Sequence, residues 1–267
     1  MIETRKLLPF LLLFFTSCSA FDYSPYDGLV KGEIGINNKN SALIERNCSK
    51  RDTIRFAVIS DTQRWYDDTQ DFVRILNKRN DIDFVLHGGD ISDFGVTKEF
   101  LWQRDILNEL KMPYVVLLGN HDCLGGGKEV FTKVFGNPNF SFKAGHTKFI
   151  CLNTNALEYD YSNPIPDFNF IDSQLDSLAS SDDKTIFAMH ARPYSDQFNN
   201  NVAKIFEKDI CRFPNLQFCL SAHDHQIEAD NLFGDGVMYY ASANIAKRSY
   251  LVFTLYKKGY KYEVVEF

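Results

Sequence analysis

Five short stretches of this sequence bring together acidic, amide and imidazole side chains at close spacing. They are Asp61-Thr62-Gln63, Asp90-Ile91-Ser92-Asp93, Asn120-His121-Asp122, the isolated His190, and His223-Asp224-His225. Neutral imidazoles combined with carboxylates and side-chain amides form a ligand set that suits first-row divalent ions such as Mn, Fe or Zn. If these stretches meet in space, the economical interpretation is a metal site.

Each stretch comes directly after a short apolar run. The runs read FAVIS, FVLHGG, VVLLG, IFAM and FCLSA, and they are typical of buried strands. Amphipathic segments between the predicted strands indicate helices over residues 68–80, 97–111, 128–136, 167–181 and 200–211. Strands that alternate with helices imply right-handed crossovers and a largely parallel sheet. Ligands of such sheets bind at the carboxyl ends of the strands, so the five stretches are expected to meet at one edge.

The last part of the chain changes character. Residues 237–243, 249–258 and 260–267 read as strands with little helix between them. We expect these strands to form a second sheet that packs against the first.

The order of the motifs resembles one known family. Asp-x-Gln, Gly-Asp-x-x-Asp, Gly-Asn-His-Asp, a single His and His-x-His follow one another over about residues 54–250, as in the calcineurin-like metallophosphoesterases. The resemblance implies a four-layer α/β/β/α sandwich, in which two mixed sheets are flanked by helices and the metal site lies at the C-terminal ends of the strands. It also implies hydrolysis of phosphomonoesters or phosphodiesters by a dinuclear metal centre with a bridging hydroxide as nucleophile.

The resemblance further implies a role for each polar residue. The first ion would be held by Asp61, Gln63, Asp90 and His225. The second would be held by Asp90, Asn120, His190 and His223, so that Asp90 is shared. His121 would protonate the leaving group, and Asp122 would fix its orientation. The metals are two divalent ions, with Mn, Fe and Zn as the candidates.

Several positions depart from the family pattern or keep more than one interpretation. Gln63 stands where the family usually has histidine, and an amide oxygen is the weaker ligand, so the first ion is expected to bind less tightly. Ala222 replaces the usual glycine before His-x-His. Asp93 either supports a ligand from behind or is a turn residue; a tyrosine occupies this place in the purple acid phosphatase branch. Arg64 either lines the substrate mouth or lies in a solvated loop.

Other polar residues have structural explanations. His87 lies inside a predicted strand and is expected to be a hydrogen-bonded structural histidine, and Asp224 is expected to be solvated. The glycines of "GGGK" at 125–128 do not form a Walker A motif, because Asp122 and Glu129 occupy its defining positions. No Cys-x-x-Cys pair supports a zinc knuckle, and pairing of Cys211 with Cys219 stays open.

The charge balance bears on the partner. The chain has 29 basic and 35 acidic residues, a net charge of −6, and no block of lysines or arginines. This pattern argues against long nucleic acids. The expected partner, as the resemblance implies, is a small phosphorylated substrate. A second hypothesis is a metal-containing lipoprotein that binds a phosphorylated ligand without turnover. Gln63 favours that alternative, whereas the intact His121-Asp122 pair favours the enzyme.

The N-terminal residues predict a separate segment. Arg5 and Lys6 precede an apolar run at 7–15 that is too short to span a bilayer but suits a signal peptide. Residues 1–17 resemble a bacterial lipoprotein signal with Cys18 as the site of lipid attachment; the alternative is an ordinary cleaved signal with a chance cysteine. The expected organisation is a tether or extension over 18–52 and a metallophosphoesterase domain over 53–267. The protein would then lie in the bacterial cell envelope, in contact with the membrane only through the lipid.

Overall fold

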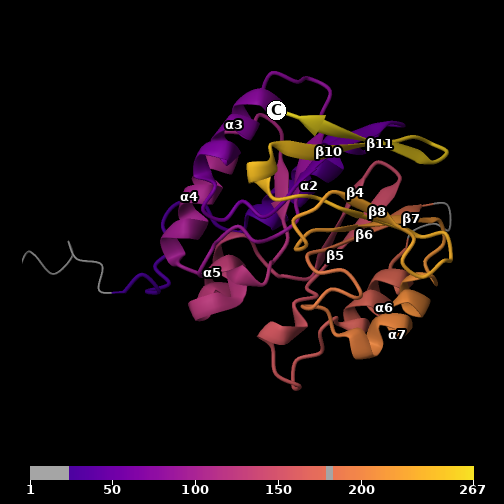
Figure 1. The fold of residues 1–267 in the computed structure, drawn as a ribbon. Coiled ribbons are helices and arrows are strands. Elements are labelled where there is room, and N and C mark those ends of the chain that lie inside the picture. Colours follow the sequence, from indigo (N-terminus) through magenta and orange to yellow (C-terminus); the bar gives the residue numbers. More distant parts are fainter. Residues whose placement is uncertain (1–23, 179–182) are drawn as a thin grey trace, which may run out of the picture.

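The strands form two mixed sheets, shown in Figure 1. The computed structural model describes residues 24–178 and 183–267, so the predicted signal peptide and Cys18 lie outside the described residues. The first sheet has the strand order β11-β10-β1-β2-β3. Its strands are β1 (Ile54–Ile59), β2 (Phe84–His87), β3 (Tyr114–Val116), β10 (Ser249–Leu255) and β11 (Tyr260–Glu266).

The second sheet has the strand order β4-β5-β6-β7-β9-β8. Its strands are β4 (Phe140–Ala144), β5 (Thr147–Leu152), β6 (Lys184–Met189), β7 (Leu216–Ser221), β8 (Glu228–Asp230) and β9 (Met238–Ala241). Within it, β5, β6, β7 and β9 run parallel, as β1, β2 and β3 do in the first sheet. The parallel strands therefore end at one edge of each sheet.

Helices cover the outer face of each sheet (Figure 1). The first sheet packs against α3 (Tyr66–Leu76), α4 (Thr97–Leu107) and α5 (Gly127–Val134). The second packs against α6 (Phe168–Asp176) and α7 (Ala203–Ile210). The predicted four-layer arrangement is confirmed.

Alternation along the strands produces these layers, because successive side chains of a strand point to opposite faces. In β1, Phe56 and Val58 belong to the core between the sheets, whereas Ala57 and Ile59 belong to the core under the helices. Phenylalanine rings dominate the core between the sheets. The Phe56–Phe84, Phe142–Phe149 and Phe218–Phe253 pairs have ring centroids 5.0, 4.8 and 4.7 Å apart. Each buried ring contributes about 1.5–3 kcal/mol of transfer free energy, so this layer fixes the two sheets against each other.

The division of the strands between the sheets differs from the prediction. The second sheet comes from the middle of the chain, and β10 and β11 return to complete the first sheet. β10 pairs antiparallel with β1, from Ile54 opposite Leu255 to Val58 opposite Leu251. Only β9 of the last three predicted strands joins the second sheet. Pairing between residues about 200 positions apart leaves no local signal in the sequence, which explains the error.

A helix that the sequence did not indicate closes one side of the sandwich. Helix α2 (Ile36–Cys48) lies in the stretch expected to be a tether or extension, and it contacts both β3 and β4. The side chain of the buried Asn37 donates to the carbonyl of Val116 (2.8 Å) and accepts from the Val116 amide (2.9 Å). Asn40 donates to the carbonyl of Tyr114 (2.7 Å). The two asparagines thus bond the free edge of β3, and α2 is part of the packed domain.

No helix in the described ranges combines the length and the apolarity needed to cross a membrane.

Replacing Asn37 should destabilise the domain strongly. Asn37→Ala removes two hydrogen bonds and leaves both backbone groups of Val116 buried without a partner, which costs about 2–4 kcal/mol in the free energy of unfolding. Urea unfolding followed by circular dichroism measures the change. The matched control is Asn38→Ala in the same helix, where the exposed side chain should change stability by less than about 0.5 kcal/mol. Equal stability of the two variants would show that Asn37 does not fix α2 to the sheet edge.

Candidate metal centre

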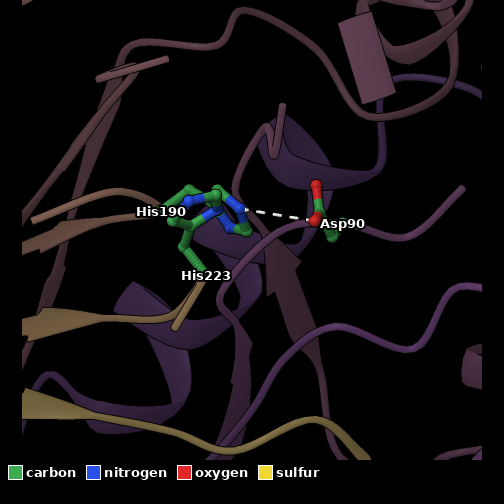
Figure 2. Close-up of side chains that lie close together, drawn as sticks. All are labelled: Asp90, His190 and His223. Atoms are coloured by element: carbon green, nitrogen blue, oxygen red, sulfur yellow. Dashed lines mark ion pairs between the residues drawn. The ribbon is translucent and has the colours of Figure 1, made fainter. Parts of the chain in front are cut away.

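The predicted ligands converge at the carboxyl ends of five strands. Two groups of side chains come close enough to hold an ion, with the atoms of each group within 4.8 Å of one another; the groups are Asp61, Asp90 and His225, and Asp90, His190 and His223. Figure 2 shows the second group, with both imidazoles beside the Asp90 carboxylate. Asp90 belongs to both groups, so the structure brings the ligands together around a shared carboxylate.

The distances within the centre are short. The Asn120 side-chain oxygen lies 3.0 Å from His190 Nε2 and 3.0 Å from His223 Nδ1. Asp90 Oδ2 lies 3.5 Å from His190 Nε2. On the other side of Asp90, His225 Nε2 lies 3.2 Å from Asp61 Oδ1. Potential ligand atoms of residues at the ends of β1, β2, β3, β6 and β7 therefore lie close together.

Orphaned buried oxygens show that the donor set fits cations. Asp61 is completely buried, and neither of its carboxylate oxygens accepts a hydrogen bond in the described part of the chain. The side-chain oxygen of Gln63 is also buried without a donor, while its nitrogen lies 3.4 Å from Asp90 Oδ2. Apart from the His225 imidazole at 3.2 Å, the Asp61 carboxylate has no partner in the described part of the chain. Burying a carboxylate costs several kcal/mol, and coordination of a metal would offset that cost. The residues present fit two divalent ions.

Strained backbone supports the same interpretation. Four of the predicted ligands have a left-handed backbone, a conformation that side chains other than glycine rarely adopt. Their φ angles are 51° for Asp61, 57° for Asp90, 69° for His223 and 56° for His225. Such residues cost about 1–3 kcal/mol each and cluster at functional sites. The fold therefore holds these ligands in positions that the isolated chain would not favour.

Glycines let the ligand loops approach one another. A Cβ atom on Gly119 would lie 2.1 Å from the Asp90 carboxylate oxygen, and one on Gly89 would lie 2.8 Å from His190 Nδ1. Only glycine fits at these two positions. Ala222 replaces the family glycine, and its φ is not positive, so the backbone accepts an alanine here. Gly88, after β2, has no Cβ and so leaves room for the Cβ of Ala222.

Hydrogen bonds select which nitrogen of each imidazole faces the centre. His190 donates from Nδ1 to the carbonyl of Gly88 (2.8 Å), which leaves Nε2 for an ion. His223 donates from Nε2 to the carboxylate of Asp196 (2.7 Å), which leaves Nδ1. A carboxylate behind a ligating histidine fixes its tautomer and raises its basicity. Asp196 was not expected from the sequence, because it lies in a loop far from His223 along the chain and carries no motif.

The buried Asp90 and His190 shift each other's pKa values. Burial opposes the charged form of His190, but the Asp90 carboxylate outweighs it and raises the pKa of His190 to about 10. Burial likewise opposes ionisation of Asp90, yet His190 lowers the pKa of Asp90. A metal needs the neutral imidazole, so binding must displace the His190 proton.

Asp122, to which the resemblance gives the role of orienting His121, makes its hydrogen bonds elsewhere. Asp122 is fully buried, and its carboxylate accepts hydrogen bonds from the backbone amides of Asp90, Ile91, Ser92 and Gly119 at 2.8–3.0 Å and from the Ser92 hydroxyl at 3.0 Å. None of the hydrogen bonds in the described ranges joins it to His121. Burial, followed by the Asp90 charge, raises the pKa of Asp122 to about 7, and the hydrogen bonds oppose that rise. Asp122 therefore clamps the loop after β2 to the loop after β3.

His121 is positioned by Asp93 instead. Its Nδ1 donates to the Asp93 carbonyl (2.7 Å) and lies 3.7 Å from the Asp93 carboxylate. Its backbone amide donates to Asp90 Oδ1 (3.0 Å). The Asp93 carboxylate also pairs with Arg64, whose side chain is more than half exposed. His121 is thus anchored to the shared ligand, with Arg64 beside it at the surface.

His87 and Asp224, which are not predicted ligands, have structural partners. His87 is fully buried, with Nε2 2.9 Å from the Thr62 hydroxyl and Nδ1 accepting from the Gly89 amide (3.2 Å). Burial lowers the pKa of His87 to about 3, so it is neutral. Asp224 is not merely solvated as expected, because Arg192 binds it at 2.9 Å. Cys211 and Cys219 are free thiols.

Comparison with known protein families gives an independent result. A family model of the calcineurin-like phosphoesterases matches residues 54–227. The chain is 27% identical over 171 residues to a 3′,5′-cyclic-nucleotide phosphodiesterase of Nostoc sp.. The match covers 59% of this chain and 63% of that protein, so the chain spans less than two thirds of that relative's length.

Solved structures show the same fold. A dimetal phosphatase from Danio rerio superposes with a TM-score of 0.63 at 12% identity, over 80% of this chain and 98% of that one. A purple acid phosphatase from yellow lupin seeds superposes with a TM-score of 0.61 at 13% identity, over 80% of this chain and 51% of that one. At these identities the likeness concerns the α/β sandwich alone.

The shared position of Asp90 predicts unequal effects on metal content. Asp61→Ala removes a ligand from one group only and should leave about one ion per chain, whereas Asp90→Ala removes the carboxylate common to both and should leave less than one. The measurement is elemental analysis after dialysis against a metal-free buffer, with the unaltered protein retaining about two ions.

The control is Cys211→Ser, because Glu207, Cys211 and Asp235 form a third group of potential ligands. This variant should keep both ions. Equal losses for Asp61→Ala and Asp90→Ala would contradict the shared-ligand arrangement.

Proposed function

The chain belongs to the calcineurin-like phosphoesterase family, and on that premise we propose that it hydrolyses phosphate esters with two divalent metal ions. The observation that carries the proposal is the fully buried Asp61, whose carboxylate oxygens accept no hydrogen bond in the described part of the chain, beside the buried Asp90. Asp90 lies in both ligand groups, which suits a dinuclear centre rather than two separate sites.

The proposed ligand sets extend the two groups of close side chains by one amide residue each, Gln63 and Asn120. Asp61, Gln63, Asp90 and His225 would hold one ion, and Asp90, Asn120, His190 and His223 would hold the other. When bound, the ions would supply the hydroxide nucleophile at neutral pH and balance the charge of the attacking and leaving oxygens. Imidazole and carboxylate ligands suit Mn, Fe and Zn alike, so all three ions are candidates. The substrate is proposed to be a small phosphomonoester or phosphodiester.

His121 is proposed to give a proton to the leaving oxygen. Its Nδ1 donates to the Asp93 carbonyl, so the proton for the leaving oxygen would come from Nε2 of the doubly protonated ring, which then becomes neutral and keeps its Nδ1–H on that carbonyl. The backbone bond from His121 to Asp90 sets the imidazole beside the ligand group without making it a ligand. Arg64, paired with Asp93 at the surface, can contact a phosphate oxygen of an entering ester. A protein that only binds its ligand would not need a positioned proton donor, so this arrangement favours the enzyme over binding without turnover.

Replacing His121 should separate catalysis from metal binding. Transfer of a proton by a positioned imidazole accelerates a reaction by about 10²–10⁴, so His121→Ala should lower kcat by that factor, or about 2.7–5.5 kcal/mol in barrier at about 1.36 per decade. Both ions should remain bound. The loss should be smallest for an ester of a nitrophenol, because such a leaving group needs little protonation.

The matched control is His146→Ala, an exposed histidine of the β4–β5 turn, which should keep full activity. Asp93→Ala should lower kcat less than His121→Ala, since it removes only the carboxylate 3.7 Å from the imidazole and keeps the backbone carbonyl to which Nδ1 donates. Unchanged turnover of a natural ester by His121→Ala would exclude the general acid and favour a protein that binds its ligand without hydrolysing it.

We also propose that the protein is anchored in the bacterial cell envelope through a lipid on Cys18, as the sequence Phe15-Thr16-Ser17-Cys18 indicates. Mass spectrometry of the native protein should find an N-terminal diacylglyceryl cysteine. Cys18→Ser should move the protein from the membrane fraction to the aqueous fraction. An unmodified Cys18, or cleavage at another position, would contradict this proposal.

A further inference from the structure

Arg192 follows the predicted ligand His190 by two residues, in the loop after β6. Three carboxylates hold its guanidinium group. Nε donates to Asp224 (2.9 Å), and the two terminal nitrogens donate to Glu228 (2.7 Å) and Asp230 (3.1 Å). Glu228 and Asp230 are the two ends of β8, at the edge of the second sheet. The Arg192 side chain is only 18% exposed, so it forms the middle of a network that ties Asp224 to this strand.

Asp224 lies between two predicted ligands of different ions. His223 belongs to one group of close side chains and His225 to the other. Both histidines have a left-handed backbone, with φ angles of 69° and 56°, and the Asp224 amide donates to the Ala222 carbonyl in a tight turn (2.8 Å). Strained residues of this kind persist only where the surrounding structure holds them in place. The contacts of residues 222–225 therefore decide whether both histidines keep the positions that ions require.

Two contacts join the loop after β6 to this segment. The two loops lie side by side, since the rings of His190 and His223 have centroids 5.2 Å apart (Figure 2). Asp196 accepts from Nε2 of His223 (2.7 Å) and so orients that single imidazole. The pair of Arg192 and Asp224 instead fixes the residue between the two histidines. It therefore acts on the ligands of both ions at once.

One alternative role for an arginine near a metal centre is to bind the substrate phosphate. The surroundings of Arg192 oppose this role, because one positive charge faces three carboxylates and the cluster is negative overall. A phosphate would be repelled there. Arg64 differs in both respects, since it pairs with the single carboxylate of Asp93 and is more than half exposed.

We propose that Arg192 is a positioning residue for both metal sites, and that it acts through Asp224 to hold the two flanking histidines in the geometry that the ions need. The inference rests on the proposed dinuclear centre and adds a residue that is neither a ligand nor a contact of the substrate. Its removal should weaken the binding of both ions and leave the recognition of the ester unchanged.

Metal affinity measures this role without turnover. Calorimetric titration of the metal-free protein with MnCl₂ should show weaker binding of both ions in Arg192→Ala, by about 10-fold each, because partners behind metal ligands contribute about 10- to 100-fold. Arg192→Lys should recover only part of the loss, since an ammonium group cannot engage three carboxylates as the planar guanidinium does. Circular dichroism of the metal-free variants should match that of the unaltered protein.

A double variant tests whether Arg192 acts through Asp224. Asp224→Ala should weaken both ions by a similar factor, and the combination with Arg192→Ala should weaken them no further, because both changes remove the same contact. Losses that add up in the double variant would overturn the proposed route.

Kinetics at saturating Mn²⁺ separate positioning from contact with the substrate. Excess metal should restore kcat of Arg192→Ala for p-nitrophenyl phosphate, and KM should stay within about twofold of the unaltered protein. A raised KM that persists at saturating Mn²⁺ would overturn the proposal, because Arg192 would then bind the ester.

The matched control is Arg212→Ala, which removes another arginine held by carboxylates, those of Asp172 and Asp209. It should leave the affinity for both ions unchanged. Unaltered affinity in Arg192→Ala, or weakening of one ion alone, would overturn the role of Arg192 and leave the proposed hydrolysis standing. An unaltered protein that binds two ions without turnover would reject the hydrolysis alone, and one that binds no ion would reject the metal centre together with this inference.

Discussion

Two carboxylates buried at the ends of neighbouring strands are the constraint on which the rest of the structure depends. Asp61 and Asp90 have almost no exposure, and the oxygens of Asp61 accept no hydrogen bond in the described part of the chain. Cations beside such a pair offset the cost of its burial. The left-handed backbone of Asp61, Asp90, His223 and His225 adds strain that the domain must offset elsewhere. The phenylalanine core between the sheets and the hydrogen bonds of Asp122 offset this strain.

The sandwich brings ligands from both sheets together at one site. Ligands on β1, β2 and β3 come from one sheet, and those on β6 and β7 come from the other. An isolated bridge next to Asp61 pairs Ser60, which follows β1, with Asn244, which lies between β9 and β10. The hydrogen bonds of Asp122 fix the Asp90 loop against Gly119, so the shared ligand cannot move independently of its neighbours. Asp196 and Asp93, one from each half of the site, then orient His223 and His121.

Features with a local signal could be predicted from the sequence, and features made by distant pairing could not. Alternation of strands and helices placed the ligands of β1, β2, β3, β6 and β7 at strand ends, where the structure has them. The return of β10 to β1 and the bonding of Asn37 to β3 depend on contacts across much of the chain. The same limit applies to side chains. The resemblance gave Asp122 the role of orienting His121, but the hydrogen bonds of Asp122 go to other residues, and His121 Nδ1 donates to the Asp93 carbonyl instead.

The central claim is that Asp90 joins two metal ions in one centre. The most direct measurement is anomalous diffraction from a crystal of the metal-loaded protein, recorded at the absorption edge of the bound element. The account predicts two peaks about 3.5–4 Å apart, each about 2.0–2.2 Å from an oxygen of Asp90. A single peak, or two peaks of which only one contacts Asp90, would contradict it.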